Sequence, residues 1–293
     1  MSVGKDTLRR FIFEGEDILG SIVRLDDCWQ KLRTADEYPP QVESLVGEAA
    51  VATALLGRSL KFDGRMTFQV QGAEHLRLLV MQSDEELNIR GIARYGDDLP
   101  EHFTELVDGG ILTVTIESGA GVMKQAERYQ SIVPLSEKSL ADCLELYYQQ
   151  SVQLPTIMML AADGDRAAGV MLQAMPERKP GSGRWKQLVE ELSALDVMRM
   201  SGLDDNALLS VLFPEDDIRL FDPEPVTFRC DCSEERIENM LRMFGPDELA
   251  NLMADSDPVE INCEFCNKQY EVSGERMLAL IAEVSGGSGG SVH

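Results

Sequence analysis

Two short stretches near the end of the chain, Phe228-Arg-Cys-Asp-Cys-Ser233 and Asn262-Cys-Glu-Phe-Cys-Asn267, contain four of its six cysteines. The pairs are Cys230-x-Cys232 and Cys263-x-x-Cys266, with thirty residues between them. Each pair can be presented by a single turn, and four thiolates complete the tetrahedral coordination of a structural zinc ion. The sequence therefore predicts one Zn²⁺ bound by these four cysteines, without a histidine or carboxylate ligand and without an open position for catalysis.

The same cysteines have other interpretations. A thioredoxin-like dithiol is one, and free or otherwise structural cysteines are another. The C-x-C pair can also close as a strained disulfide, since residues two apart in a strand have Cα atoms roughly 6.5 Å apart. The dithiol interpretation is weakened by the presence of two pairs where an oxidoreductase needs one. Acidic neighbours, Asp257, Glu260 and Glu264, also oppose thiolate formation without a metal.

Charge and composition limit the class of protein. The chain has 293 residues, 44% of them hydrophobic, which is enough to bury two or three modest cores. Its formal charge of −24 repels polyanions, so nucleic acid and anionic membrane surfaces are poor partners. Neither a run of membrane-spanning length nor a signal-peptide core is found in the sequence, so we expect a protein of the reducing cytosol.

Alternating and β-branched segments predict an α+β fold for residues 1–176, a large domain of helices and mostly antiparallel β-sheet. The connections are too short for repeated crossover helices. Helices are predicted near 27–36, 41–60 and 139–150, and the second has an apolar face rich in small residues that suits close packing on the sheet.

A run of proline, glycine and charged residues at 176–183 marks the first domain boundary. Residues 177–229 are predicted to form an amphipathic helical linker, with helices that are too short to be stable alone and must pack on the large domain. Candidate linker residues for contact with a client protein, once exposed, are Trp185, Leu188, Leu192, Leu208 and Phe213.

Residues 230–284 are predicted to form a small zinc-binding domain of helices and a hairpin, followed by a flexible tail at 285–293. A module of this size has too few large side chains for a self-sufficient core, so the metal would supply much of its folding energy.

These residues resemble a known family, the redox-regulated heat-shock holdases called 33 kDa chaperonins. The resemblance rests on C-x-C followed by C-x-x-C at the end of a chain of this length. It extends over nearly the whole chain, through the segments Leu60-Lys-Phe-Asp-Gly64, Glu127-Arg-Tyr-Gln130, Gln153-Leu-Pro-Thr156 and Ala167-Ala-Gly169.

The resemblance implies a redox switch. In the family the four cysteines bind zinc in the reduced, inactive protein, and oxidation to two disulfides with zinc release produces an ATP-independent holdase for unfolding proteins. Carried over residue by residue, the implied pairs are Cys230–Cys232 and Cys263–Cys266. The resemblance also implies a homodimer in the oxidised state.

Two other functional classes stay open: a constitutive zinc-stabilised interaction module, and a dithiol oxidoreductase that uses Cys263 and Cys266. The sequence has no phosphate-binding loop of the ATPase type, and its three histidines are far apart without a nucleophile motif, so we predict a protein that is not an enzyme. Cys28 and Cys143 are interpreted as ordinary, partly buried thiols of helices.

Overall fold

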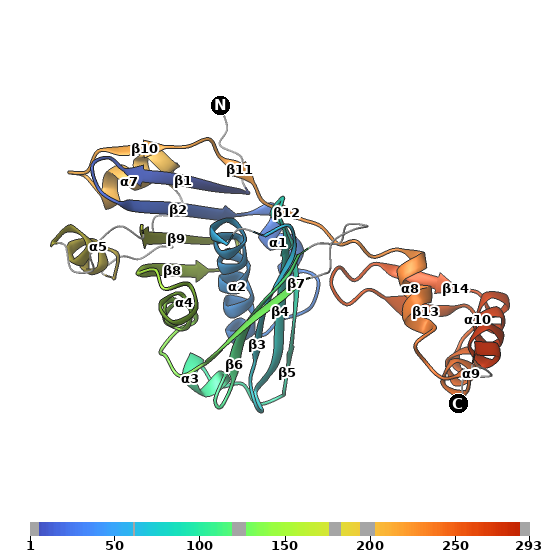
Figure 1. The fold of residues 1–293 in the computed structure, drawn as a ribbon. Helices are drawn as coiled ribbons and strands as arrows, with labels where there is room; N and C mark the ends of the chain where they lie inside the picture. Colours follow the sequence, from blue (N-terminus) through green and yellow to red (C-terminus); the bar gives the residue numbers. More distant parts are fainter. Residues whose placement is uncertain (1–5, 61, 119–126, 176–182, 194–202, 288–293) are drawn as a thin grey trace. The chain divides into compact units, whose positions relative to one another are not determined.

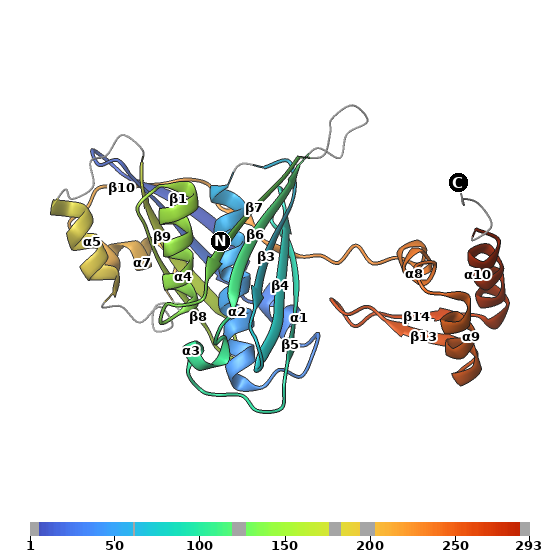
Figure 2. The ribbon, with the colours of Figure 1, turned by 60° about the horizontal axis from the view of Figure 1, so that its bottom comes forward.

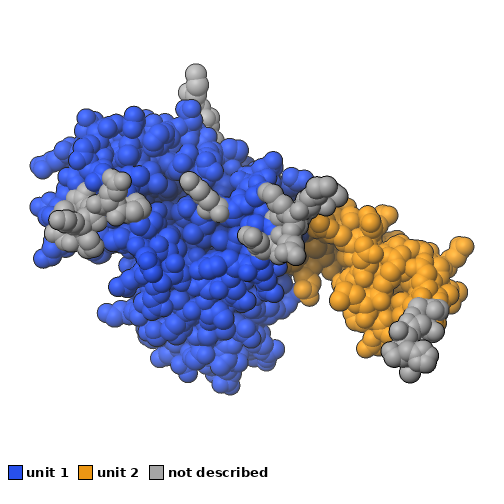
Figure 3. Space-filling model, in the orientation of Figure 1, with its two compact units in different colours: residues 1–229 blue, residues 230–293 orange. Residues whose placement is uncertain are grey.

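The computed structural model of the chain describes residues 6–60, 62–118, 127–175, 183–193 and 203–287. The chain separates into two compact units, residues 1–229 and residues 230–293 (Figure 3). The run at 176–183 that marks the predicted boundary between core domain and linker lies outside the described residues except for Gly183. The division of the first unit into residues 1–176 and 177–229 therefore stays a prediction.

The first unit contains two six-stranded sheets (Figures 1 and 2). Sheet A has the order β10-β1-β2-β9-β8, with β11 also paired to β1, and all its pairings are antiparallel. Its strands are β1 (Thr7–Phe13), β2 (Ile18–Leu25), β8 (Thr156–Ala162), β9 (Ala167–Ala174), β10 (Ile218–Leu220) and β11 (Glu224–Pro225).

Sheet B has the order β12-β5-β4-β3-β6-β7. Its pairings are antiparallel except that between β12 and β5, which is parallel. Its strands are β3 (Gly64–Gln71), β4 (Leu76–Asp84), β5 (Asn88–Tyr95), β6 (Ile111–Ser118), β7 (Glu127–Pro134) and β12 (Thr227–Phe228).

Helix α2 (Pro40–Ser59) lies between the two sheets and forms the centre of the main core (Figures 1 and 2). It is buried on nearly all sides, as expected for a helix without a continuous polar face. Small residues permit this fit: a Cβ added to Gly47 would lie 2.3 Å from the Cβ of Ala162 in β8. Helices α1 (Asp27–Arg33) and α4 (Leu140–Tyr147) also contribute buried side chains to this core.

Two further helices, α5 (Gly183–Ser193) and α7 (Asp205–Leu212), cover the opposite face of sheet A. A second apolar cluster forms there between the leucines of these helices and sheet residues such as Phe11, Phe13 and Leu172. Strand β9 is buried along its whole length because both faces of the sheet are covered. The amphipathic helices predicted after residue 183 thus pack on the large domain.

The second unit combines a hairpin with three helices: α8 (Glu234–Leu241), α9 (Pro246–Asp255), β13 (Val259–Asn262), β14 (Gln269–Val272) and α10 (Gly274–Gly287). Its core is small and includes Leu241, Leu249, Met277 and Leu280. Helices α8 and α10 are also joined by a hydrogen bond of 2.8 Å from Arg276 Nε to Glu238. Helix α10 continues to Gly287, three residues into the predicted flexible tail; residues 288–293 lie outside the described part of the chain.

The predicted α+β class with antiparallel pairing, helices and a C-terminal four-cysteine cluster is confirmed. The strands of the large domain form two sheets around α2. Periodicity alone did not predict that division, since a buried strand has the same pattern in either sheet. Short elements were also missed: α3 (Phe103–Leu106), the π-helical turn Tyr148–Val152, and strands β10, β11 and β12. Among the described helices, none is long and apolar enough to cross a membrane.

Candidate metal centre

The first cysteine pair lies on the extended segment that enters α8. Cys230 and Cys232 are both half-buried. Ser233 follows directly and caps the helix, since its hydroxyl accepts a hydrogen bond of 3.2 Å from the amide of Arg236. The capped helix start fixes the direction in which this segment leaves Cys232.

The second pair lies in the turn between β13 and β14. Cys263 is buried and Cys266 half-buried. The turn is closed by two backbone hydrogen bonds, from Asn267 N to Cys263 O at 2.8 Å and from Cys263 N to Lys268 O at 2.9 Å. Asn267 has a φ of 56°, in the left-handed region that asparagine tolerates better than most residues. The hairpin thus turns both thiols to one side.

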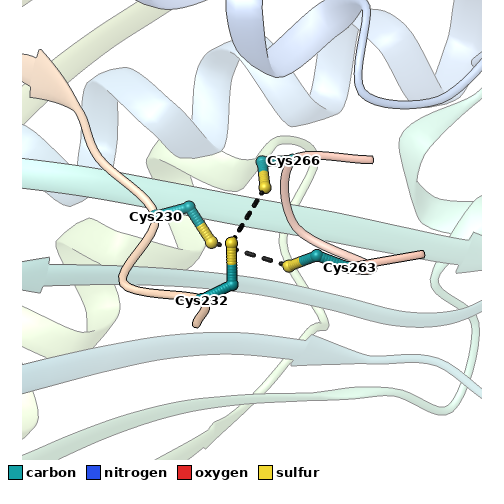
Figure 4. Close-up of side chains that lie close together, drawn as sticks. All are labelled: Cys230, Cys232, Cys263 and Cys266. Atoms are coloured by element: carbon teal, nitrogen blue, oxygen red, sulfur yellow. Dashed lines mark hydrogen bonds between the residues drawn. The ribbon is translucent and has the colours of Figure 1, made fainter. Parts of the chain in front are cut away.

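The four sulfur atoms meet in a single cluster (Figure 4), and all lie within 4.8 Å of one another. Cys230 Sγ is 3.6 Å from Cys263 Sγ, and Cys232 Sγ is 3.4 Å from Cys266 Sγ. All four thiols are free of disulfides. Four sulfurs placed about 2.3 Å from a central zinc ion would be roughly 3.8 Å apart, so the observed spacing suits a tetrahedral thiolate site.

The thiols do not ionise equally without a metal. Burial raises the pKa of Cys230 and, more strongly, that of Cys266. Burial opposes the thiolate of Cys232 as well, but hydrogen bonds from Tyr270 and from the neighbouring thiols outweigh it and lower the pKa of Cys232 to about 7. A bound dication would favour the thiolate form at all four positions.

Hydrogen-bond donors surround the sulfur cluster. The amide of Cys232 donates to the Cys230 sulfur, and the amide of Lys268 donates to that of Cys266. Tyr270 is buried, and its hydroxyl has no nitrogen or oxygen partner within the described residues. The hydroxyl interacts instead with Cys232, which raises the pKa of Tyr270. Donors of this kind compensate the negative charge that four thiolates bring to a metal.

The donor set fits zinc. Four soft sulfur atoms from two turns, with amide and hydroxyl donors behind them, are the kind of ligand set that a closed structural zinc site uses. The same geometry does not favour an oxidoreductase that uses Cys263 and Cys266, because a catalytic thiol requires an exposed, readily ionised sulfur. Here Cys263 is buried, and the pKa of Cys266 is above its ordinary value.

The linker candidates lie elsewhere, in the apolar cluster on sheet A. Leu188 and Leu192 of α5 are fully buried, Leu208 of α7 and Phe213 are nearly so, and Trp185 is half-buried. In this structure these five side chains are packed against strands, and their exposure to clients stays a prediction.

The remaining cysteines fit the interpretation as ordinary thiols. Cys28 and Cys143 are buried in the main core, and burial raises the pKa of both. Sequence reasoning missed Tyr270 as a neighbour of the cluster, because only the register of the hairpin, in which Tyr270 pairs with Ile261, places it there.

Comparison with known proteins identifies the family. The sequence model of the Hsp33 protein family matches residues 6–273 of this chain. A 33 kDa chaperonin of Nitrosococcus oceani is 36% identical over 280 residues, covering 95% of each chain. That of Methylobacillus flagellatus is 37% identical over 93% of this chain and 94% of its own, and that of Shewanella baltica is 34% identical over 96% and 97%.

A solved structure supports the fold. The crystal structure of the 33 kDa chaperonin of Thermotoga maritima superposes with a TM-score of 0.81, covering 97% of this chain and 100% of its own, at 20% sequence identity. The family is one of chaperones and not of enzymes, in agreement with the prediction. The full-length match and the four-cysteine cluster together establish that this chain belongs to the Hsp33 family.

Proposed function

We propose that the protein is a redox-regulated, ATP-independent holdase that binds unfolding proteins under oxidative stress in the cytosol. In the reduced state, Cys230, Cys232, Cys263 and Cys266 hold one zinc ion and the protein is inactive. Oxidation of the four cysteines to the disulfides Cys230–Cys232 and Cys263–Cys266 releases the metal and activates the protein. The oxidised form would bind clients as a homodimer.

One observation supports this proposal above the others: four thiols from two distant turns meet at the core of a small folding unit. The side chains of Cys230, Cys232 and Cys266 pack against that core, and Cys263 belongs to it. A bound zinc ion would offset the charge of the thiolates and cross-link the start of α8 to the hairpin. Structural zinc of this type contributes about 10–16 kcal/mol to the folding of small domains.

The chemistry of the switch needs only an oxidant. Hydrogen peroxide takes two electrons from each cysteine pair: one thiol is oxidised to a sulfenic acid with release of water, and its partner thiol then displaces a second water to form the disulfide. Starting from four zinc-bound thiolates, two peroxide molecules and four protons from solvent thus give two disulfides and four waters. A disulfide sulfur is no longer an anionic ligand, so the unit loses its metal and its cross-link.

The second unit would then unfold, and helices α5 and α7 of the first unit would lose their packing. Leu188, Leu192 and Leu208 would leave sheet A and expose apolar surface for clients. A holdase needs no chemistry on its client, because binding the unfolded chain competes with aggregation by mass action.

An aggregation assay tests the proposal. Light scattering of a heat-labile enzyme would be followed with reduced, zinc-loaded protein and with peroxide-treated protein, while zinc release is measured with a chromogenic chelator. We expect suppression of aggregation only after oxidation, together with release of one zinc per chain. A Cys28→Ser, Cys143→Ser variant is the matched control, and it should switch like the parent.

The same assay separates the alternatives. Equal protection by the reduced and oxidised protein would favour a constitutive zinc-stabilised interaction module and would contradict the switch. Catalytic turnover of a disulfide substrate, lost in a Cys263→Ser variant, would favour a dithiol oxidoreductase.

A further inference from the structure

A buried carboxylate lies at the start of α7, where this helix meets sheet A. Asp205 is only 2% exposed. Its Oδ1 is 3.1 Å from Nε of Arg24 in β2, and its Oδ2 is 3.5 Å from Nη1 of Arg9 in β1. The Arg24 guanidinium also donates a hydrogen bond to the carbonyl of Leu203, two residues before the helix. Two strands of the sheet thus hold the first turn of α7 by charge.

The helix does not need Asp205 as a cap. Asp204 is the N-cap residue, and its exposed side chain accepts a hydrogen bond of 2.9 Å from the amide of Ala207. Sequence position alone makes the two aspartates look equivalent. The structure gives them different roles, because Asp204 completes the helix and Asp205 faces the sheet.

The ion cluster is only partly satisfied. Within the described residues, neither oxygen of Asp205 has a hydrogen-bond partner of good geometry, and the same holds for Nε and Nη2 of Arg24. Burial lowers the pKa of Arg24, an effect that the charge of Asp205 opposes. Charges in such a place gain little net stability over a well-packed apolar contact, but the loss of one partner leaves the other buried without a counter-charge. The cluster therefore makes the docking of α7 depend on one carboxylate.

The docked helix hides an apolar surface. Leu208, Leu209, Leu212 and Phe213 pack with residues of β1, β2 and β9. The ring of Phe213 lies 5.0 Å from that of Phe13 and 6.1 Å from that of Phe11, centroid to centroid. Removal of α7 would uncover these rings on the outer face of sheet A.

We propose that Asp205, Arg9 and Arg24 form a buried electrostatic latch that positions α7 on sheet A. Breaking this latch alone, with all four cysteines reduced, releases α7 and uncovers the apolar face beneath it. The latch belongs to residues 6–229, so it stands whether or not the proposed redox activation is correct.

Two single variants of the full-length, reduced, zinc-loaded protein test the latch. Asp205→Asn removes the buried charge with little change of shape. Asp204→Asn is the matched control, since it removes a charge one residue away and asparagine caps a helix as well as aspartate does. Hydrogen exchange read by mass spectrometry gives the protection of residues 205–213, and an apolar fluorescent dye reports the uncovered surface.

We expect exchange at 205–213 to be at least tenfold faster in Asp205→Asn, with more dye bound and with unchanged exchange in residues 230–287. The Asp204→Asn variant should exchange like the parent. Equal exchange in the two variants would overturn the latch, and so would a uniform increase across residues 6–229, which would indicate general destabilisation.

A triple variant, Arg9→Met, Arg24→Met and Asp205→Leu, keeps the test decisive if Asp205→Asn does not fold. An apolar replacement of the whole cluster leaves no buried charge unpaired. We expect residues 205–213 of this variant to be protected at least as well as in the parent. If they exchange tenfold faster than in the parent, unpaired charge is not what releases α7 and the latch is refuted.

Discussion

The hydroxyl of the buried Tyr270 contacts a sulfur of the cluster. The role of this hydroxyl can be tested without disturbing the packing of the second unit. Tyr270→Phe removes only that hydroxyl. We predict about tenfold weaker zinc binding, in the range found when a group that hydrogen-bonds to a metal ligand is lost, measured by competition with a chromogenic chelator. Tyr95→Phe, which removes a hydroxyl bonded to the Glu37 carbonyl, is the control. Unchanged affinity in Tyr270→Phe would rule out a role for this donor.

The ligand assignment is tested by the double variant Cys263→Ser, Cys266→Ser. Two thiolates from the C-x-C pair cannot complete a closed tetrahedral site, so we predict that the purified variant contains almost no zinc. Metal analysis by mass spectrometry, with Cys28→Ser, Cys143→Ser alongside, measures this directly. Zinc at one ion per chain in the first variant would exclude these cysteines as the ligands.

At this scale the sequence predicted residues with a distinctive spacing and missed those whose role depends on tertiary contacts. The four cysteines are recognisable because each pair is local in sequence. Tyr270 and Asp205 are not, because the hairpin register brings one to the sulfurs and the packing of α7 brings the other to Arg24.

A carboxylate of helix α4 forms a hydrogen bond with the edge strand β8. Glu145 Oε1 accepts a hydrogen bond of 2.7 Å from the amide of Met158. Burial nevertheless raises the pKa of Glu145 to about 7, and the backbone hydrogen bond only partly opposes this shift. Between about pH 4.5 and pH 7, the folded state therefore holds a proton on Glu145, whereas the unfolded chain, with a pKa near 4.5, has released it.

The contribution of Glu145 to stability is complete below about pH 4.5 and is lost as the pH rises through about 7. We predict that Glu145→Gln raises the thermal midpoint of the first unit by about 2 °C at pH 8 relative to the parent, and by less at pH 5. Scanning calorimetry at the two pH values measures this, with the exposed Glu105→Gln as control. A larger gain at pH 5 than at pH 8 would contradict the assigned shift.

Elements were predicted well where periodicity is strong. The two amphipathic helices after residue 183 were expected to pack on the large domain, and they do. Which surface they cover could not be derived, because β8 and β9 are apolar on both faces and the sequence does not say which face meets α2. The short strands β10 to β12 were missed since two or three residues contain too little pattern.

The two compact units of the whole molecule should respond differently to metal removal. The first has a large core around α2, whereas the second has a few apolar side chains around the cysteines. We predict that chelation of zinc abolishes cooperative unfolding of residues 230–287 and leaves the main transition of the first unit in place. Calorimetry of the metal-loaded and metal-free protein tests this. A metal-free second unit with an unchanged transition would mean that its core is sufficient alone.

The central claim is that the thiol state of the second unit controls the packing of α5 and α7 on sheet A of the first unit. Hydrogen exchange of the reduced, zinc-loaded protein and the peroxide-oxidised, zinc-free protein tests it most directly. We predict that residues 230–287 lose protection on oxidation and that α5 and α7 lose protection with them, while α2 stays protected. If residues 230–287 lose protection but α5 and α7 exchange as slowly as in the reduced protein, these helices are not part of the switch and the claim is wrong.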